Sequence, residues 1–131
     1  MAERPLSPHL SVYRMYRYTL LTSILNRATG LALSAALILL VYWLAAVARG
    51  PVAYEAARRV LSLDVLKAVY VGLLAAFSYH LFAGIRHLIW DTGHGLERSQ
   101  AKRSAWLVAL ASLALFAALA WWALHSGGSA R

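Results

Sequence analysis

The chain lacks cysteine and has few prolines and acidic residues: its 131 residues include no Cys, 3 Pro and 5 Asp or Glu. Without a thiol, the chain can form no disulfide, hold no thiolate-ligated iron–sulfur cluster and attach no haem through a CxxCH motif. Charged residues make up 14% of the sequence, well below the roughly 25% of ordinary globular proteins. These absences exclude several classes of redox protein and argue against a soluble domain.

Hydrophobic residues dominate instead, at 61% of the chain, and the mean hydropathy is +0.59. Three runs contain no Asp, Glu, Lys or Arg: residues 28–48, 68–85 and 105–124, of 21, 18 and 20 residues. A helix rises about 1.5 Å per residue, so each run approximately spans a hydrocarbon core of roughly 30 Å. The strict alternation of a membrane strand is absent.

The sequence therefore predicts an all-α membrane protein with three transmembrane helices, at about 23–48, 65–90 and 104–125. Together they form a single membrane-anchor domain over residues 1–131. The first run is too long and begins too late for a signal peptide, so we expect this helix to be retained.

The segments outside the three helices carry their own signals. Prolines at 5 and 8 favour an extended cytoplasmic segment before the first helix. AYEAARRVLSL, in the connection near 49–64, predicts a short interfacial helix. Two glycines after Asp91 should end the second helix.

The formal net charge is +8 at pH 7. Because the cations flank the apolar runs, we expect anionic lipid headgroups and partner proteins as their counterparts, and no nucleic acid. Eight cations lie on one side and five on the other: Arg4, Arg14, Arg17, Arg27, Arg86, Arg98, Lys102 and Arg103 against Arg49, Arg58, Arg59, Lys67 and Arg131. The positive-inside rule then predicts that the N-terminus lies inside and the C-terminus outside.

Ionisable residues at membrane depth are rare and point to function. Ser23 and Arg27 are four residues apart and so share a helix face. In one interpretation Ser23 caps the helix and Arg27 reaches to lipid headgroups. In the other, the hydroxyl and the guanidinium face a polar ligand group, such as a quinone carbonyl or a carboxylate.

The second predicted helix carries a stripe on one face, at spacings of three and four residues: Phe77, His80, Gly84, His87 and Asp91. Gly84 would let a flat macrocycle or a neighbouring helix approach. His80 is either an imidazole bonded to a neighbouring helix or a haem-iron ligand, for which neutral imidazole is suited. The chain offers no second histidine at comparable depth, so another polypeptide would supply a second ligand.

Three segments, RPLSPHLSVYR, SILNRATG and HLFAGIRHLIWDTGHG, occur in the order and spacing that resemble the cytochrome b subunit of succinate dehydrogenase, respiratory complex II. The resemblance covers roughly residues 4–30 and 78–95. It implies a membrane anchor that pairs with a second small anchor subunit and binds an iron–sulfur subunit and a flavoprotein subunit. It also implies electron flow from succinate, through FAD and iron–sulfur clusters of those partners, to ubiquinone, with haem b held between the two anchors.

Carried over by position, the resemblance makes His80 an axial haem-iron ligand and places Gly84, His87 and Arg27 at the haem. It assigns Ser23, Ile24 and Arg27 to the quinone site. Many members have histidine where this chain has Asn26, so a propionate contact or proton relay is not carried over to that position.

The chain has no nucleotide-binding loop, HExxH motif or paired carboxylates at depth, so it has no dehydrogenase site of its own and is expected to act as an enzyme subunit. The resemblance implies the bacterial cytoplasmic membrane or the mitochondrial inner membrane. Three alternatives stay open: the anchor of a quinol:fumarate reductase, a haem-free membrane scaffold, and a transporter component in which Arg27 and His80 line a pathway.

Overall fold

The computed structural model describes residues 17–126, and within that range every regular element is an α-helix. The helices are α1 (Arg17–Ala48), α2 (Pro51–Leu61), α3 (Asp64–Asp91) and α4 (Arg98–Ser126). Three of them, α1 from Leu20 onward, α3 and α4, are long and apolar enough to cross a membrane. The prediction of three transmembrane helices is therefore confirmed.

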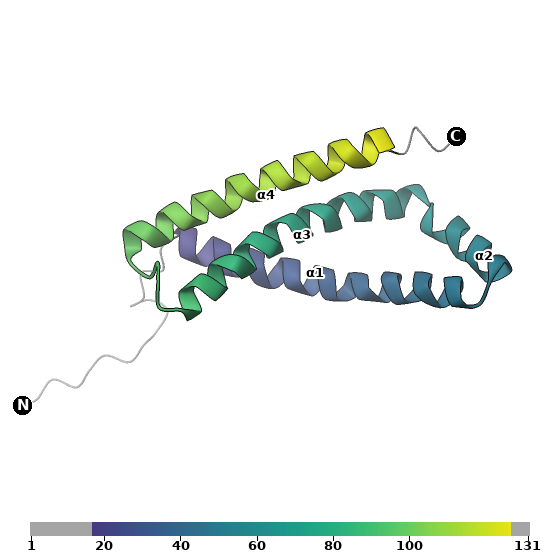
Figure 1. Ribbon diagram of the computed structural model, residues 1–131, viewed down its shortest axis with the longest axis horizontal. Coiled ribbons are helices and arrows are strands. Elements are labelled where there is room, and N and C mark those ends of the chain that lie inside the picture. Colours follow the sequence, from purple (N-terminus) through teal and green to yellow (C-terminus); the bar gives the residue numbers. More distant parts are fainter. Residues whose placement is uncertain (1–16, 127–131) are drawn as a thin grey trace, which may run out of the picture.

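The three long helices form an antiparallel bundle in which α3 packs against both α1 and α4 (Figure 1). The short helix α2 closes one end of the bundle, which we call the α2 end. The loop between α3 and α4 closes the other end, where α1 also begins, and we call it the loop end (Figure 1). Residues near the start of α1 and near the end of α3 therefore lie at the same end of the bundle.

The breaks between helices follow from glycine and proline. Gly50 has a φ of 97°, which L-residues rarely adopt, and Pro51 begins α2, where a missing backbone N–H costs nothing. Gly93 and Gly95, with φ values of 81° and 78°, follow the end of α3 at Asp91, as the sequence predicts.

The helix α2 confirms the short helix expected in the first connection. On its surface Arg58 donates to Glu55 at 2.8 Å, and this hydrogen bond holds the pKa of the Glu55 carboxyl below its ordinary value. The pair is exposed and so adds little to stability.

The long helices extend further than predicted at their ends, since α1 begins at Arg17 and α4 at Arg98. The extra turn of α4 carries Arg98, Lys102 and Arg103, and the aliphatic stems of such residues tolerate a membrane interface. The expected extended N-terminal segment lies outside the described residues, and a single domain over 1–131 stays a prediction.

Few side chains are fully buried within the chain. In the described range the buried hydrophobic residues are small ones, Ala46, Ala57, Ala83 and Val108. Many large apolar side chains point outward, and Leu31 and Ile38 have more than 70% of their surface exposed. Small residues let membrane helices approach closely, and the outward apolar surface is available to lipid and to partner helices.

Candidate functional site

Ser23 and Arg27 are joined on the first long helix. The Arg27 guanidinium donates through Nη2 to Ser23 Oγ at 3.2 Å. Because α1 begins at Arg17, Ser23 lies six residues inside the helix, about 9 Å along its axis. Ser23 is therefore not a helix cap, and that part of the first interpretation is wrong, whereas the reach of Arg27 to lipid headgroups stays a prediction. The pair presents a hydroxyl and a cation side by side toward the loop end.

His80 is half-buried on α3 and is bonded to α1. Its Nδ1 lies 3.2 Å from Thr29 Oγ1. The Thr29 hydroxyl has one proton and donates it to the Leu25 carbonyl at 2.7 Å, so toward His80 it can only accept. Nδ1 then carries the ring proton and Nε2 keeps its lone pair. Within residues 17–126, Nε2 makes no hydrogen bond.

The two interpretations of His80 therefore use different ring atoms. The bond to a neighbouring helix occupies Nδ1, whereas ligation of a metal needs an unprotonated nitrogen, which Nε2 provides. Sequence reasoning missed Thr29, although it stands in the SILNRATG segment. The sequence signal that could have indicated Thr29 is its hydroxyl, three residues after Asn26 and near the start of an apolar run.

Gly30 lies directly against the imidazole. A Cβ added at Gly30 would meet His80 Cε1 at 3.0 Å, which is tighter than nine in ten real Cβ contacts. Glycine thus lets the α1 backbone reach the ring edge. Gly84 differs, because a Cβ there would meet nothing within 4 Å in the described chain. The space beside Gly84 is therefore open within the described chain, which leaves room for the approach of another group that the sequence predicts there.

His87 is exposed and turned toward its own helix. Its Nδ1 lies 2.8 Å from the Ala83 carbonyl, which only a protonated nitrogen can bind. Its ring centroid is 5.4 Å from that of Trp90. His80 and His87 thus share the stripe but have separate partners, one on α1 and one on α3.

Asn26 has a buried side-chain oxygen without a partner. Among the described residues, Asn26 Oδ1 is the buried side-chain polar atom that makes no hydrogen bond. Such an atom costs about 1–3 kcal/mol if it stays unsatisfied. Asn26 lies one helical turn before Gly30 on α1.

Arg86 was expected at the membrane boundary, and the structure shows it inside the bundle. It is 5% exposed, and it donates to Ser104 Oγ at 2.9 Å and to the Ala101 carbonyl at 3.0 Å. Its guanidinium carbon also lies 3.9 Å from the Trp90 ring centroid. These contacts tie α3 to α4 near the loop end. The spacing of Arg86 and Trp90, four residues apart, was the signal in the sequence.

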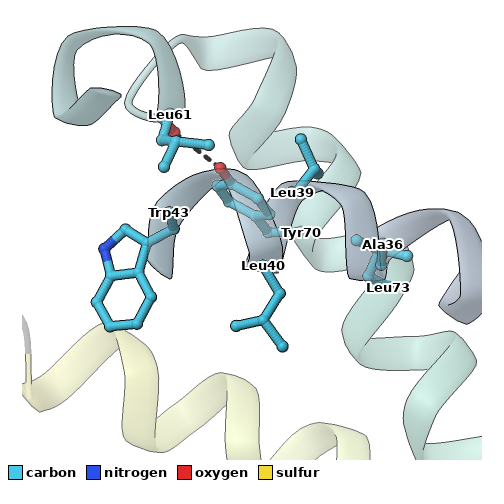
Figure 2. A pocket seen from close by; sticks show the side chains of 7 residues that line it. All are labelled: Ala36, Leu39, Leu40, Trp43, Leu61, Tyr70 and Leu73. Atoms are coloured by element: carbon cyan, nitrogen blue, oxygen red, sulfur yellow. Dashed lines mark hydrogen bonds between the residues drawn. The ribbon is translucent and has the colours of Figure 1, made fainter. Parts of the chain in front are cut away.

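A separate apolar groove of about 380 Å³ lies near the α2 end. Figure 2 shows its lining: Ala36, Leu39, Leu40, Trp43, Leu61, Tyr70 and Leu73. Its polar feature is the Tyr70 hydroxyl, which donates to the Leu61 carbonyl at 3.0 Å (Figure 2). None of the residues predicted for haem or quinone lines this groove, so it lies apart from the candidate site.

No cluster of three or more His, Asp or Glu side chains that could hold a metal ion occurs among residues 17–126. Haem iron is commonly held by histidine, and one partly buried histidine with an unprotonated Nε2 could supply one such ligand. The open space at Gly84 and the close approach at Gly30 fit a flat group beside the ring. The described residues are thus compatible with half of a haem site.

Three membrane-length helices, with polar groups gathered toward one end of the bundle, define a helical membrane protein. The family described as "Succinate dehydrogenase/Fumarate reductase transmembrane subunit" matches residues 1–119. The chain belongs to this family, is an integral membrane protein, and is a subunit of an enzyme complex.

Individual relatives agree. The succinate dehydrogenase cytochrome b556 subunit of Paracoccus denitrificans is 42% identical over 112 residues, covering 86% of this chain and 85% of the relative. The cytochrome b560 subunit of Reclinomonas americana is 35% identical over 125 residues, covering 90% and 84%. The mitochondrial cytochrome b560 subunit of Sus scrofa is 35% identical over 117 residues, covering 82% and 64%. The resemblance drawn from the three sequence segments is confirmed.

Proposed function

We propose that this chain is a membrane anchor of succinate:quinone oxidoreductase that binds haem b together with a second anchor subunit and forms part of the ubiquinone reduction site. The observation that carries the proposal is the state of His80, whose Nδ1 is bonded to Thr29 while Nε2 keeps its lone pair. Relatives named as cytochrome b subunits support it.

In this proposal His80 is an axial ligand of the haem iron. The haem, when bound, supplies a one-electron carrier within the membrane. The open space beside Gly84 accommodates the macrocycle, and Arg27 and His87 are the candidates for its propionates. A second histidine ligand would come from the partner anchor, because this sequence has no other histidine at comparable depth.

Ser23, Ile24 and Arg27 form this chain's share of the quinone site. Negative charge develops on the quinone oxygens during reduction, and a hydroxyl and a guanidinium beside them stabilise that charge, most strongly where water is scarce. The 3.2 Å contact between Arg27 and Ser23 holds both donors within one helical turn. Ile24, with half of its surface exposed, offers an apolar wall.

The partners and the orientation follow from the same proposal. A flavoprotein subunit and an iron–sulfur subunit, carrying FAD and iron–sulfur clusters, dock at the loop end and pass electrons from succinate. That end faces the cytoplasm or matrix, by the excess of cations there. The membrane is the bacterial cytoplasmic membrane or the mitochondrial inner membrane. Because the matching family covers fumarate reductases too, a quinol:fumarate reductase anchor is the second candidate.

The quinone assignment is tested with the purified complex. Succinate oxidation is measured with ubiquinone and, separately, with a water-soluble acceptor that accepts electrons from the partner subunits. Arg27→Gln should lower ubiquinone reduction by about 10²-fold, the usual cost of losing one charge-stabilising donor, and leave the soluble-acceptor rate unchanged. The control is Arg59→Gln, on the exposed surface of α2. Unchanged ubiquinone reduction in Arg27→Gln would contradict the assignment.

A further inference from the structure

We propose that Thr29 is a positioning residue for the haem ligand: its hydroxyl fixes the tautomer and the rotation of His80 so that Nε2 is the nitrogen presented to iron. The inference rests on the proposed haem role of His80 and goes beyond it, because it assigns a function to the α1 residue behind the ligand. Gly30 completes the arrangement by admitting the ring.

The direction of the hydrogen bond follows from the proton count on the Thr29 hydroxyl. Oγ1 lies 2.7 Å from the Leu25 carbonyl and 3.2 Å from His80 Nδ1. If the hydroxyl proton pointed at His80, two acceptor oxygens would face each other at 2.7 Å without a proton between them. The proton therefore goes to Leu25, and His80 donates to Thr29.

The acceptor is held in one place by the helix itself. A threonine hydroxyl that bonds back to the carbonyl one turn earlier occupies a defined χ1 rotamer. Thr29 Oγ1 makes this bond to Leu25 and a second, longer contact of 3.1 Å to the Asn26 carbonyl. The position that receives the His80 proton is thus fixed before any ligand binds, and the ring is oriented by a rigid neighbour.

Gly30 sets how close the ring can come. His80 Cε1, the ring atom between the two nitrogens, would lie 3.0 Å from a Cβ at that position, and Nδ1 would lie 3.6 Å away. A methyl group there would push the ring edge outward and lengthen the Thr29 bond. The adjacent pair on α1 therefore fixes both the rotation and the depth of the imidazole.

An acceptor behind a ligating histidine has measurable consequences. It orients the ring and raises the basicity of the ligating nitrogen, and its loss typically lowers metal affinity 10- to 100-fold. A more basic ligand favours ferric over ferrous iron. Removing the acceptor should therefore weaken haem retention and move the midpoint potential of the remaining haem upward.

The test compares Thr29→Val with Thr29→Ser in the purified complex. Valine matches threonine in shape and removes the acceptor, whereas serine keeps it. Haem is quantified per copy of this chain, and the midpoint potential is measured by optical redox titration. We expect Thr29→Val to retain haem roughly 10- to 100-fold more weakly and at a higher potential, and Thr29→Ser to match the wild type. If Thr29→Val does not accumulate, Thr29→Ala replaces it with the same expected result.

A second pair tests the close approach. Gly30→Ala should lower haem retention and shift the spectrum, because the added methyl group meets His80. Gly72→Ala is the matched control on α3, where an added Cβ meets nothing within 4 Å, and it should match the wild type.

The outcomes separate the inference from the function on which it rests. Wild-type haem content and potential in Thr29→Val, or equal losses in Thr29→Val and Thr29→Ser, would overturn the positioning role while haem still depends on His80. A wild-type complex without b-type haem, or with haem that survives His80→Ala, would instead overturn the proposed function.

Discussion

The two halves of the bundle hold their helices together in different ways. In the half toward the loop end, hydrogen bonds cross between helices: His80 to Thr29, Tyr79 to the Thr22 carbonyl at 3.3 Å, and Arg86 to α4. We call this the polar half. In the half toward the α2 end, which we call the apolar half, the long helices α1 and α3 meet across a groove lined mostly by leucine and aromatic side chains, and the hydrogen bond of Tyr70 there joins α3 to the short helix α2 (Figure 2).

The two halves differ in how strongly their contacts fix the position of each side chain. Apolar side chains pack in several similar ways and gain little from one another in a membrane, because lipid tails are equally apolar. A polar group without a partner costs much more, so a hydrogen-bonded contact favours one arrangement. The polar half therefore specifies the position of individual side chains, and the proposed haem and quinone residues all lie there.

The largest effect should come from filling the open space in the polar half. A Cβ added at Gly84 meets nothing within 4 Å in the chain itself, so the helix should tolerate Gly84→Leu. If the haem occupies that space, overpacking costs about 1–3 kcal/mol, and most of the haem should be lost. Gly72→Leu, in the apolar half, is the control and should keep its haem. Haem per chain is read from the absorption spectrum, and full retention in Gly84→Leu would refute the stripe assignment.

An effect of comparable size, on stability and not on haem content, is expected where α3 meets α4. Arg86→Met removes the donors to Ser104 and Ala101 and should lower the stability of the complex by about 1.5–3 kcal/mol, the usual worth of a hydrogen bond from a charged group. Arg86→Lys keeps the positive charge but lacks the planar guanidinium, so the stability of this variant should lie between those of the wild type and Arg86→Met. The stability of both variants is measured by thermal inactivation of succinate–quinone activity. Equal stability of Arg86→Met and the wild type would contradict the role given to Arg86.

Two tyrosines allow a matched comparison between the halves. Tyr79→Phe removes the bond to Thr22 in the polar half, and Tyr70→Phe removes the bond to Leu61 at the α2 end. Each should cost about 0.5–1.5 kcal/mol of stability, but only Tyr79→Phe, whose residue adjoins His80, should also shift the haem spectrum. A spectral shift in Tyr70→Phe of the same size would remove the distinction between the halves.

The smallest effect concerns the exposed pair on α2. The pKa of Glu55 is held down chiefly by its hydrogen bond from Arg58. A carboxyl with a lowered folded-state pKa contributes stability above its unfolded pKa and loses it as the pH falls through the folded value. Wild-type α2 should thus be slightly better protected against hydrogen exchange than Glu55→Gln at pH 7, and the difference should vanish in acid. A difference that persists in acid would contradict the assignment.

Much of the fold could be predicted from the sequence because its signals are long. An uncharged run such as residues 28–48 admits few structures besides a membrane helix. The end of α3 was predictable as well, since glycines at 93 and 95 adopt positive φ. The start of α1 was not, because Arg17 and the residues after it carry neither a capping signal nor a strongly apolar pattern.

The candidate site was predictable residue by residue on each helix but not across helices. Spacing places Ser23 beside Arg27, and the structure joins them at 3.2 Å. Spacing within α3 cannot show that His80 meets Thr29 and Gly30, because that depends on the register between α1 and α3, and His80 and Thr29 are 51 positions apart in the chain. The partner-facing residues were equally hidden, because the groups that would cover Gly84 are not in this sequence.

The most direct test of the account is a dithionite-reduced minus oxidised absorption spectrum of the purified complex, recorded for the wild type, His80→Ala and His125→Ala. His125 is exposed at the end of α4, bonded to Trp121 at the α2 end, and serves as the control. The account predicts a low-spin b-type band in the wild type and in His125→Ala that is lost or altered in His80→Ala. An unchanged band in His80→Ala, or no b-type band in the wild type, would contradict it.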